Sequence, residues 1–434
     1  MAYRNFDDVC LDRRALLRSG ALFGGGALLA GSPFASALAK APATAWPTVT
    51  AMVADYVAQR KVANMVATLG WGQKAPQFIA RGVLTIGQPE LAGPDGLYRI
   101  YSMTKPITGM AAMILIDEGK LGLDQPIAEI LPAFAKMRVL KNPSGPLEDT
   151  VPAERPITVR HLLTHTAGLG YEIVSKGPIK AAYQRYGLLP VQVSRLSLPG
   201  VNDFLPVAGL DKFADTLARV PLVYQPGAKW SYSVSLDLLG RVIEVAARQP
   251  FDRFLHERIF APSGMTSTWF RVPASEVARF TTNYGILGGT PVPMDPARAS
   301  IYLDEPAFPF GGAGLVSSPR DYDRFLMMLA GLGAIGGKRV MSERAVRLGT
   351  SDLLPAGVRA ADGAGFGAGG RSHDGNYGWG GAAGTVGFVN IGNGLRGNLM
   401  TQYMPSDAYP VHAAFPAAVL KDLAAMMPAK KVAA

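Results

Sequence analysis

The sequence predicts an α/β fold of the α+β kind, in which an antiparallel sheet is flanked by helices and a helix-rich lobe lies beside it. Strand-like segments occur near both ends of the chain, a long apolar helix follows the first group, and a helical and irregular stretch separates the two groups. Strands and helices do not alternate as βαβ units would require. Within residues 40–434 we expect an α/β lobe of about 45–124 and 301–434, and a helix-rich lobe of about 125–300.

Length and composition are those of a folded globular protein. The chain has 434 residues, of which 48% are hydrophobic and 18% are charged, which allows one large core or two packed lobes. The formal net charge is +10, but the basic residues are scattered and no basic run carries interleaved aromatic residues. We therefore expect no nucleic-acid partner.

The first 39 residues resemble a bacterial twin-arginine signal peptide. Arg13 and Arg14 precede an apolar, glycine-rich stretch at 19–31 and a small-residue cleavage pattern at 37–39. The apolar stretch is shorter than the roughly 20 residues of a spanning helix. An uncleaved membrane anchor is the alternative. Cleavage would give a periplasmic or secreted protein with no stable membrane anchor and, because Cys10 is the only cysteine, no disulfide.

A helix and a β-hairpin should come first in the folded part. Apolar residues at helical spacing predict the helix over 49–63, after a short linker at 40–47. Strand-like runs over 64–71 and 77–84 predict the hairpin, because a turn-forming stretch at 72–76 separates them.

The central motif of the chain is Ser102-x-x-Lys105 at the start of an apolar helix. Pro106 is tolerated only in a first turn, so the helix should begin near Ser102–Lys105, and Gly119 should end it. Residues three apart share a helix face, so the hydroxyl and the amine can meet. Burying a lysine costs free energy unless its amine gains a partner or loses its proton. A serine beside such an amine is a candidate activated nucleophile.

The middle of the chain should be helical with irregular connections. Asp124 is expected to cap a short helix that has Pro126 in its first turn and ends at Pro132. Residues 141–156 should form a loop, and 170–210 should be irregular. Further helices are predicted over 158–165, 211–220, 235–248 and 251–259.

The C-terminal part returns to strands and glycine-rich segments. Strands are predicted over 267–271, 311–316, 338–340, 377–380, 384–390 and 394–403. A helix should begin at Ser318 and run to about Gly331. The closing helix is predicted over 416–427, with Pro416 in its first turn.

Two more segments could contribute to the same site as Ser102. Tyr232 lies where a loop meets a predicted helix, and its hydroxyl could share a proton with a serine. The glycine-rich stretch 377–385 could approach a ligand closely and present a backbone N–H to an oxyanion. Taken alone, the simpler interpretations are an interface tyrosine with a satisfied hydroxyl and a glycine-rich turn.

Together these segments resemble the serine hydrolases of the β-lactamase and penicillin-binding-protein superfamily. The resemblance is closest to the class C β-lactamase-like esterases, the family VIII carboxylesterases, and runs from about residue 45 to the C-terminus. Ser102 to Lys105 matches the Ser-x-x-Lys box, and Tyr232 matches the tyrosine of the Tyr-x-Asn/Ser box. The other familiar segments are 163–169, 312–318 and Trp379-Gly380-Gly381. The implied fold is β-lactamase/transpeptidase-like.

The resemblance implies a role for each matching residue. Ser102 would be the nucleophile, while Lys105 and Tyr232 would form the base, with either of them acting first. The implied oxyanion and substrate-binding groups are Ser102, Ala382, Trp379, Gly380 and Gly381. The substrate would be a small ester or amide, with no cofactor and no metal. The sequence indicates no oligomeric state.

Two departures from the family pattern narrow the expected substrate. Val234 stands where lactamases usually carry asparagine, and Trp379 where lactamases and peptidases usually carry lysine or histidine. Both changes remove polar groups that would hold a β-lactam amide or a carboxylate, so we expect a neutral ester. The alternatives are a β-lactamase or D-Ala-D-Ala carboxypeptidase on the same fold and a non-catalytic peptidoglycan-binding protein. The presence of all three box residues argues against the last.

Several other patterns are weaker. His161 and His165 are four residues apart, but no glutamate follows the first histidine as in His-Glu-x-x-His zinc sites. Gly365-x-Gly367-x-x-Gly370 matches a dinucleotide pattern in its letters only, without a βαβ context. No Gly-x-Ser-x-Gly elbow is present. His373 and Asp374 could line the cleft, although a solvated loop is the simpler interpretation.

Overall fold

A seven-stranded antiparallel sheet combines strands from the N-terminal and C-terminal parts of the described residues. The computed structural model describes residues 45–196, 203–360 and 362–426, and the predicted signal peptide lies outside them. The strand order is β11-β12-β13-β14-β15-β1-β2, and β1 lies between β15 and β2. The strands are β1 (Asn64–Trp71), β2 (Gln77–Gly82), β11 (Gly365–Phe366), β12 (Arg371–His373), β13 (Asn376–Gly380), β14 (Val386–Asn390) and β15 (Leu395–Met400). The predicted β-lactamase-like α+β fold is confirmed.

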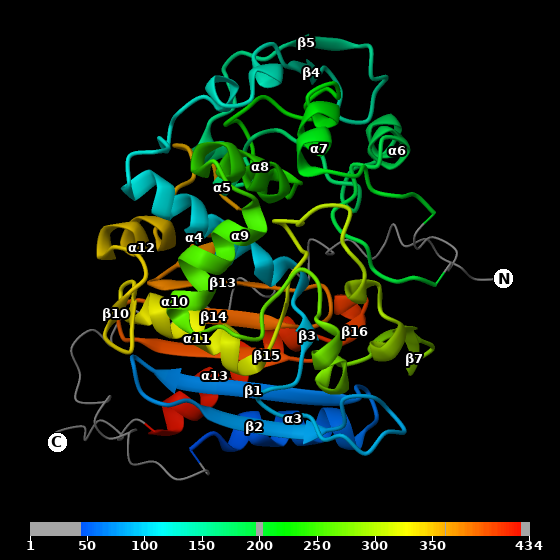
Figure 1. The fold of residues 1–434 in the computed structure, drawn as a ribbon, viewed down its shortest axis with the longest axis vertical. Helices are drawn as coiled ribbons and strands as arrows, with labels where there is room; N and C mark the ends of the chain where they lie inside the picture. The colour runs from blue at the N-terminus through cyan, green and yellow to red at the C-terminus, as the bar shows by residue number, and fades with distance from the viewer. Residues whose placement is uncertain (1–44, 197–202, 361, 427–434) are drawn as a thin grey trace, which may run out of the picture.

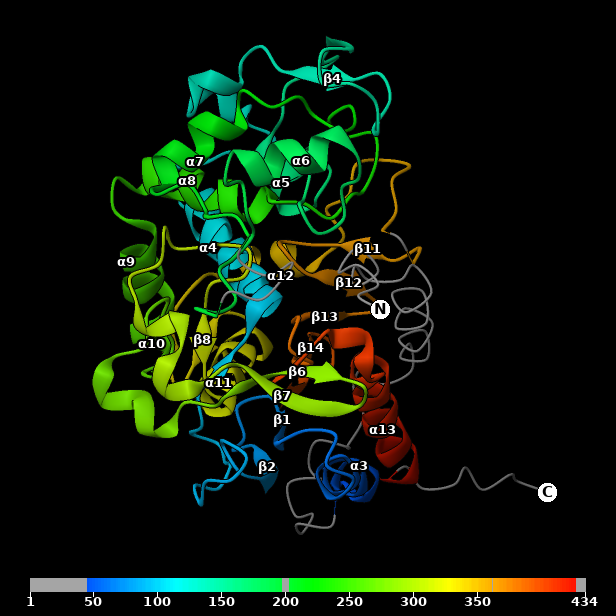
Figure 2. The ribbon, with the colours of Figure 1, turned by 90° about the vertical axis from the view of Figure 1, so that its right-hand side faces the viewer.

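Helices cover both faces of this sheet (Figures 1 and 2). Helices α3 (Pro47–Ala58) and α13 (Val411–Met426) pack on each other over one face, and α11 (Pro319–Ala330) packs on the other. The predicted start of the closing helix at Pro416 is wrong. The helix begins at Val411, because Val411 and Phe415 are fully buried and their burial stabilises a first turn ahead of the proline.

The central helix α4 (Thr104–Asp117) follows a single 3₁₀ turn, η3 (Tyr101–Met103), so the predicted helix start is confirmed. Gly119, with φ of +69°, follows its end. Almost every residue of α4 is buried, and the helix contacts α8 (Ser235–Ala247) and α12 (Glu343–Thr350). A Cβ on Gly109 would lie 2.0 Å from the Ala368 carbonyl oxygen, so this close approach requires glycine.

Helices gather at the end of the molecule remote from β1 and β2 (Figures 1 and 2). They are α5 (Val159–Leu163), α6 (Pro178–Arg185), α7 (Leu210–Leu217) and α8, joined by the hairpin β4 (Arg138–Leu140) and β5 (Thr150–Pro152). Neither α6 nor this hairpin was predicted: the strands have three residues each, too few for a visible alternation. The division into two lobes at the predicted residues stays a prediction.

Asp124 does not cap a helix as predicted. Its carboxylate accepts from the Arg160 guanidinium, with Nε–Oδ1 at 2.6 Å, and the 3₁₀ turn η4 (Ile127–Glu129) begins after Pro126 without a side-chain cap. The Asp124 carboxylate therefore forms an ion pair with Arg160 and not a hydrogen bond to a backbone N–H at the start of η4. Pro132 starts a second 3₁₀ turn, η5 (Pro132–Phe134), instead of only ending the first.

The remaining elements complete the scaffold around the start of α4. The predicted strand over 267–271 is wrong, because only Trp269 forms a bridge, with Val316. The unpredicted hairpin of β6 and β7 pairs in parallel with β16. The strands are β3 (Tyr98–Arg99), β6 (Asn283–Leu287), β7 (Thr290–Asp295), β8 (Val316–Ser317), β9 (Ala334–Ile335), β10 (Lys338–Arg339) and β16 (Tyr403–Met404). The helices and helical turns are α9 (Phe251–Leu255), η6 (His256–Phe260), α10 (Ala261–Ser263), η7 (Ala274–Arg279), η8 (Ala297–Ala299), η9 (Ile301–Leu303) and η10 (Ser406–Ala408).

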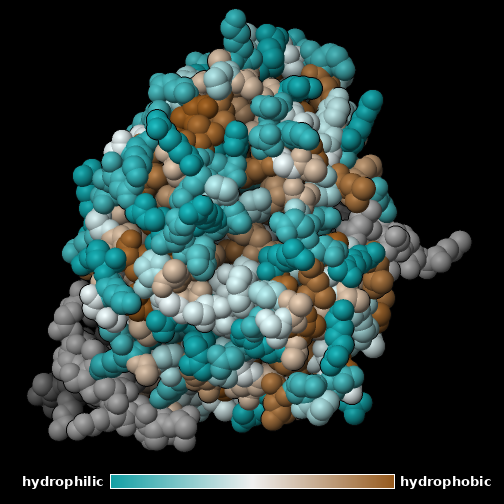
Figure 3. All heavy atoms as spheres, viewed as in Figure 1, coloured by the Kyte–Doolittle hydropathy of each residue, from teal (hydrophilic) through white to brown (hydrophobic). Residues whose placement is uncertain are grey.

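The surface is mixed in character. Hydrophilic residues cover most of the face in Figure 3, with hydrophobic residues in small separate groups. No helix in the described residues combines the length and the apolar character that crossing a membrane requires.

Candidate active site

The structure brings Ser102, Lys105 and Tyr232 together. Lys105 Nζ donates to Ser102 Oγ at 3.2 Å, and the Tyr232 hydroxyl donates to the same oxygen at 2.8 Å. Ser102 lies in η3 and Lys105 in the first turn of α4, so one helix start sets their spacing. Tyr232 precedes α8, which packs against α4 and brings the phenol to the serine. A hydroxyl that contacts both an amine and a phenol can exchange its proton with either.

The buried amine of Lys105 is held by the backbone and by a nearby carboxylate. Its side chain is fully buried, and Nζ donates to the Gly312 carbonyl oxygen at 2.7 Å. Asp237, also fully buried, accepts from the Gly312 N–H at 2.8 Å. Burial raises the pKa of Asp237 to about 7, and the charge of Lys105 opposes this rise. Asp237 and Lys105 are thus linked through Gly312, because the carboxyl accepts from its N–H and the amine donates to its carbonyl oxygen.

Aromatic side chains enclose Tyr232. The Trp379 indole N–H donates to the Tyr232 hydroxyl oxygen at 3.2 Å. The Tyr171 ring lies edge-on to the Tyr232 ring, with centroids 5.1 Å apart, and the His165 ring lies at 4.8 Å. Lys105 Nζ lies 4.5 Å from the centroid of the Tyr232 ring. These contacts fix the phenol beside the serine.

The turn after β13 places the predicted oxyanion-binding residues beside the serine. A Cβ on Gly381 would lie 2.4 Å from the Ile100 carbonyl oxygen, so this backbone abuts the segment that leads into Ser102. Within the part of the chain that the structure describes, no hydrogen bond engages the Ala382 N–H, and Ala382 is half-buried. An unpaired N–H at this position is available to a ligand oxygen.

Three residues near the site were missed from the sequence. Asp237 had a detectable signal, because it is an acidic residue among the apolar positions of α8. Gly312 lies in the segment 312–318 that carried the family resemblance, but nothing in the sequence indicated that its carbonyl binds Lys105. His412, which contacts the turn after β13, lies in the first turn of α13 and had no sequence signal.

The two histidines of the 158–165 segment have structural partners. His161 completes a capping box at the start of α5: its Nδ1 accepts from the N-cap Thr158 N–H. Burial lowers its pKa to about 4. Burial also lowers the pKa of His165 well below its usual value, and its Nδ1 accepts from the Ser233 N–H. Across the described segments, no group of three or more His, Cys, Asp or Glu residues is placed to hold a metal ion.

The glycines of segment 365–370 allow close approaches between backbone segments. The His373–Asp374 pair, which was also singled out from the sequence, lies away from the serine. Gly365 begins the edge strand β11, and a Cβ on Gly369 would lie 2.3 Å from the Lys105 carbonyl oxygen. Gly369 therefore lets the backbone pass close to α4. The His373 imidazole lies 3.1 Å from the Asp374 carboxylate next to the β12–β13 turn, and neither residue contacts Ser102.

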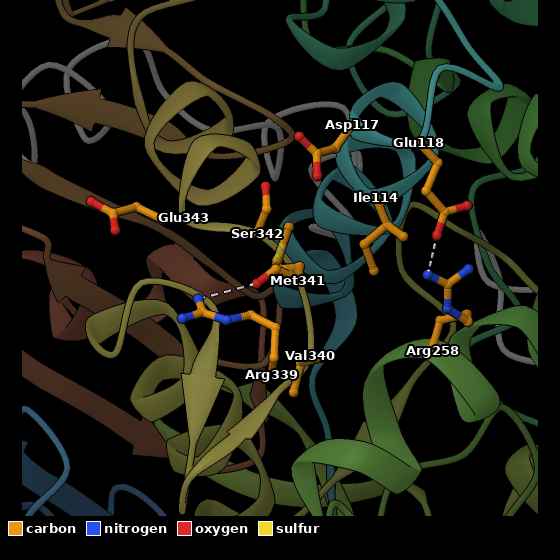
Figure 4. A pocket seen from close by; sticks show the side chains of 9 residues that line it. All are labelled: Ile114, Asp117, Glu118, Arg258, Arg339, Val340, Met341, Ser342 and Glu343. Atoms are coloured by element: carbon orange, nitrogen blue, oxygen red, sulfur yellow. Dashed lines mark hydrogen bonds and ion pairs between the residues drawn. The ribbon is translucent and has the colours of Figure 1, made fainter.

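A pocket of about 420 Å³ lies at the opposite end of α4 (Figure 4). Ile114, Asp117 and Glu118 line it, roughly 20 Å along the helix from the serine. Its charged groups are partly engaged, because Arg258 pairs with Glu118 and Arg339 donates to a backbone carbonyl. This pocket is separate from the Ser102 site, and we assign it no role in the chemistry at Ser102.

The fold and the Ser102 site define a serine hydrolase of the β-lactamase type. The Beta-lactamase family model matches residues 49–421, and the chain belongs to this family.

Several known proteins are similar to the chain. An uncharacterized protein of Mycobacterium tuberculosis (strain CDC 1551 / Oshkosh) is 40% identical over 261 residues, which are 60% of this chain and 60% of that protein. The match therefore spans less than two thirds of that relative. The esterase EstB of Burkholderia gladioli is 31% identical over 336 residues, 71% of this chain and 77% of EstB. The structure of EstCE1, "a hydrolase with promiscuous acyltransferase activity", is 24% identical with a TM-score of 0.67, and the match covers 89% of this chain and 100% of EstCE1.

Proposed function

We propose that the chain is an exported serine esterase that cleaves small, neutral esters through an acyl-enzyme on Ser102. The observation that carries the proposal is the contact of one serine oxygen with both the Lys105 amine and the Tyr232 hydroxyl. The similarity to EstB, whose name is that of an esterase, supports the choice of ester over amide.

Each step of the proposed reaction uses a group at the site. Ser102 Oγ attacks the ester carbonyl carbon, and its proton passes to the pair of Lys105 and Tyr232. The N–H groups of Ser102 and Ala382 stabilise the oxyanion of the tetrahedral intermediate. The pair then returns the proton to the leaving alcohol, and the acyl group stays on Ser102. Water then attacks the acyl carbon and gives up a proton to the same pair. The pair returns this proton to Ser102 Oγ as the bond between that oxygen and the acyl carbon breaks, which releases the acid and regenerates the serine.

Val234 and Trp379 stand where the family usually carries polar residues, and this difference supports a neutral substrate. Val234 is fully buried and offers the site no amide, and Trp379 uses its N–H on Tyr232. Neither residue brings a positive charge for a substrate carboxylate. A β-lactam antibiotic or a peptide carboxylate would therefore lose interactions that a neutral ester does not need.

A comparison of two substrates tests this function. Wild type and Ser102→Ala are assayed with a short-chain nitrophenyl ester and with a chromogenic cephalosporin. We expect wild type to prefer the ester and Ser102→Ala to lose about 10³-fold or more in kcat/KM. Cephalosporin turnover well above ester turnover would contradict the esterase assignment, and equal ester turnover by Ser102→Ala would contradict catalysis by this serine.

Export through a twin-arginine pathway to the periplasm or medium is part of the proposal. It rests on Arg13, Arg14 and the apolar stretch that follows. Cell fractionation of the full chain should find wild type outside the cytoplasm and the variant with both arginines changed to lysine inside it. Equal distribution of the two proteins would contradict this route.

A further inference from the structure

His412 contacts the turn that carries the Ala382 N–H. Its Nε2 lies 3.1 Å from the Gly381 carbonyl oxygen and 3.1 Å from the Thr385 carbonyl oxygen. Carbonyl oxygens only accept hydrogen bonds, so Nε2 must carry the proton and donate it to this pair. Burial lowers the pKa of His412, although the two carbonyls oppose this effect, so the neutral Nε2–H form is favoured near neutral pH.

The Gly381 carbonyl belongs to the same peptide group as the Ala382 N–H. The one cis peptide bond in the described residues is Met404–Pro405, so the Gly381–Ala382 bond is trans. In a planar trans peptide the C=O and the N–H point in opposite directions. A hydrogen bond that turns the carbonyl toward His412 on α13 therefore turns the Ala382 N–H away from α13.

Two further contacts restrict this turn. The Gly381 N–H donates to the Thr385 carbonyl at 2.8 Å, and the Gly384 N–H donates to the Gly381 carbonyl at 3.1 Å. His412 Nε2 joins the same two carbonyls from outside the turn. Gly380 lies directly against this imidazole, because a Cβ there would be 3.0 Å from Nε2.

We propose that His412 is a positioning residue that orients the Gly381–Ala382 peptide so that the Ala382 N–H faces the oxyanion formed at Ser102. The proposal rests on the proposed function, because it concerns the same reaction. His412 touches no reacting atom. It acts through the peptide group, and its loss should affect the transition state more than the bound ester.

The matched variants are His412→Gln and His412→Asn. The Gln side-chain amide can place its N–H₂ near the position of Nε2, whereas the shorter Asn amide reaches only the position of Nδ1. With a short-chain nitrophenyl ester we expect His412→Asn to lower kcat by about 10- to 100-fold with KM within about threefold of wild type. His412→Gln should keep kcat within about threefold of wild type.

A second readout separates positioning from a structural role. His412→Ala is assayed with and without added imidazole, which can donate to the two carbonyls from the vacated space. We expect added imidazole to restore the kcat of His412→Ala, while the melting temperature of this variant is the same with and without imidazole. The imidazole experiment also tests the positioning role of His412 if His412→Asn does not fold.

Each outcome bears on one proposal. Wild-type kcat in His412→Asn, or a loss of kcat that neither His412→Gln nor imidazole restores, would overturn the positioning role. Ser102→Ala is measured alongside: if it is inactive while His412→Asn is normal, the proposed function stands and only the role of His412 fails.

Discussion

Replacing Lys105 with methionine should lower kcat/KM for a short-chain nitrophenyl ester by about 10³-fold, because the amine that shares the serine proton is lost. Methionine is similar in length and leaves the apolar packing of the side chain in place. The variant also removes the donor to the Gly312 carbonyl. Steady-state kinetics of purified wild type and variant measure the effect, and a loss below tenfold would contradict a role for the amine in proton transfer.

The same substitution should change how stability depends on pH. The folded-state pKa of Asp237 is raised to about 7 from its ordinary value of 3.8, so the folded state retains this proton more strongly than the unfolded state. Stability contributed by the protonated carboxyl is therefore lost as the pH rises from about 4 toward 7. Lys105 opposes the rise in pKa, so in Lys105→Met the loss should extend to higher pH.

A double variant provides the control. Adding Asp237→Asn to Lys105→Met removes the buried carboxylate, so it should restore the melting temperature at pH 8 but not the activity. Restored activity in the double variant would mean that the single variant failed through stability alone.

Substitution of Gly381 by alanine should reduce kcat/KM by about 10²-fold, because the Ala382 N–H would be displaced from the oxyanion. The new Cβ would lie 2.2 Å from Thr385 Oγ1 and 2.4 Å from the Ile100 carbonyl oxygen. The hydroxyl can rotate away, but the carbonyl belongs to the backbone just before Ser102, so the turn itself must shift. A lower melting temperature should accompany the loss.

Gly93→Ala is the matched control for this substitution. A Cβ on Gly93 meets nothing within 4 Å, and Gly93 is absent from the positive-φ residues. It should therefore retain wild-type kinetics. Kinetics for Gly381→Ala equal to those of Gly93→Ala would contradict the proposed oxyanion role of the turn after β13.

Local sequence signals predicted the elements that have a long periodic pattern or that begin or end at a proline, a glycine or a capping residue. The hairpin of β1 and β2, the start of α4 just before Pro106, and the helices α8 and α11 follow from periodicity, proline and capping residues. The strands β4 and β5 could not be predicted, because their register depends on pairing with each other and not on an internal pattern. In α13, burial of Val411 and Phe415 outweighed the local preference of Pro416.

The site was predictable to different degrees. Spacing alone placed Ser102 and Lys105 on one face of a helix start. The contact with Tyr232 joins residues 130 positions apart, so it came from the family resemblance and not from local rules. The roles of Asp237 and His412 depend on which backbone groups the fold brings beside them, and no sequence pattern encodes these contacts.

Direct detection of the acyl-enzyme is the most immediate test of the central claim that Ser102 carries the acyl group. The enzyme is mixed with a short-chain nitrophenyl ester, quenched in acid within the first turnovers, digested and analysed by mass spectrometry. The account predicts one added acyl group on the peptide that contains Ser102 and none on that peptide from Ser102→Ala. Ester hydrolysis by wild type with an unmodified Ser102 peptide, or with the acyl group on another residue, would contradict it.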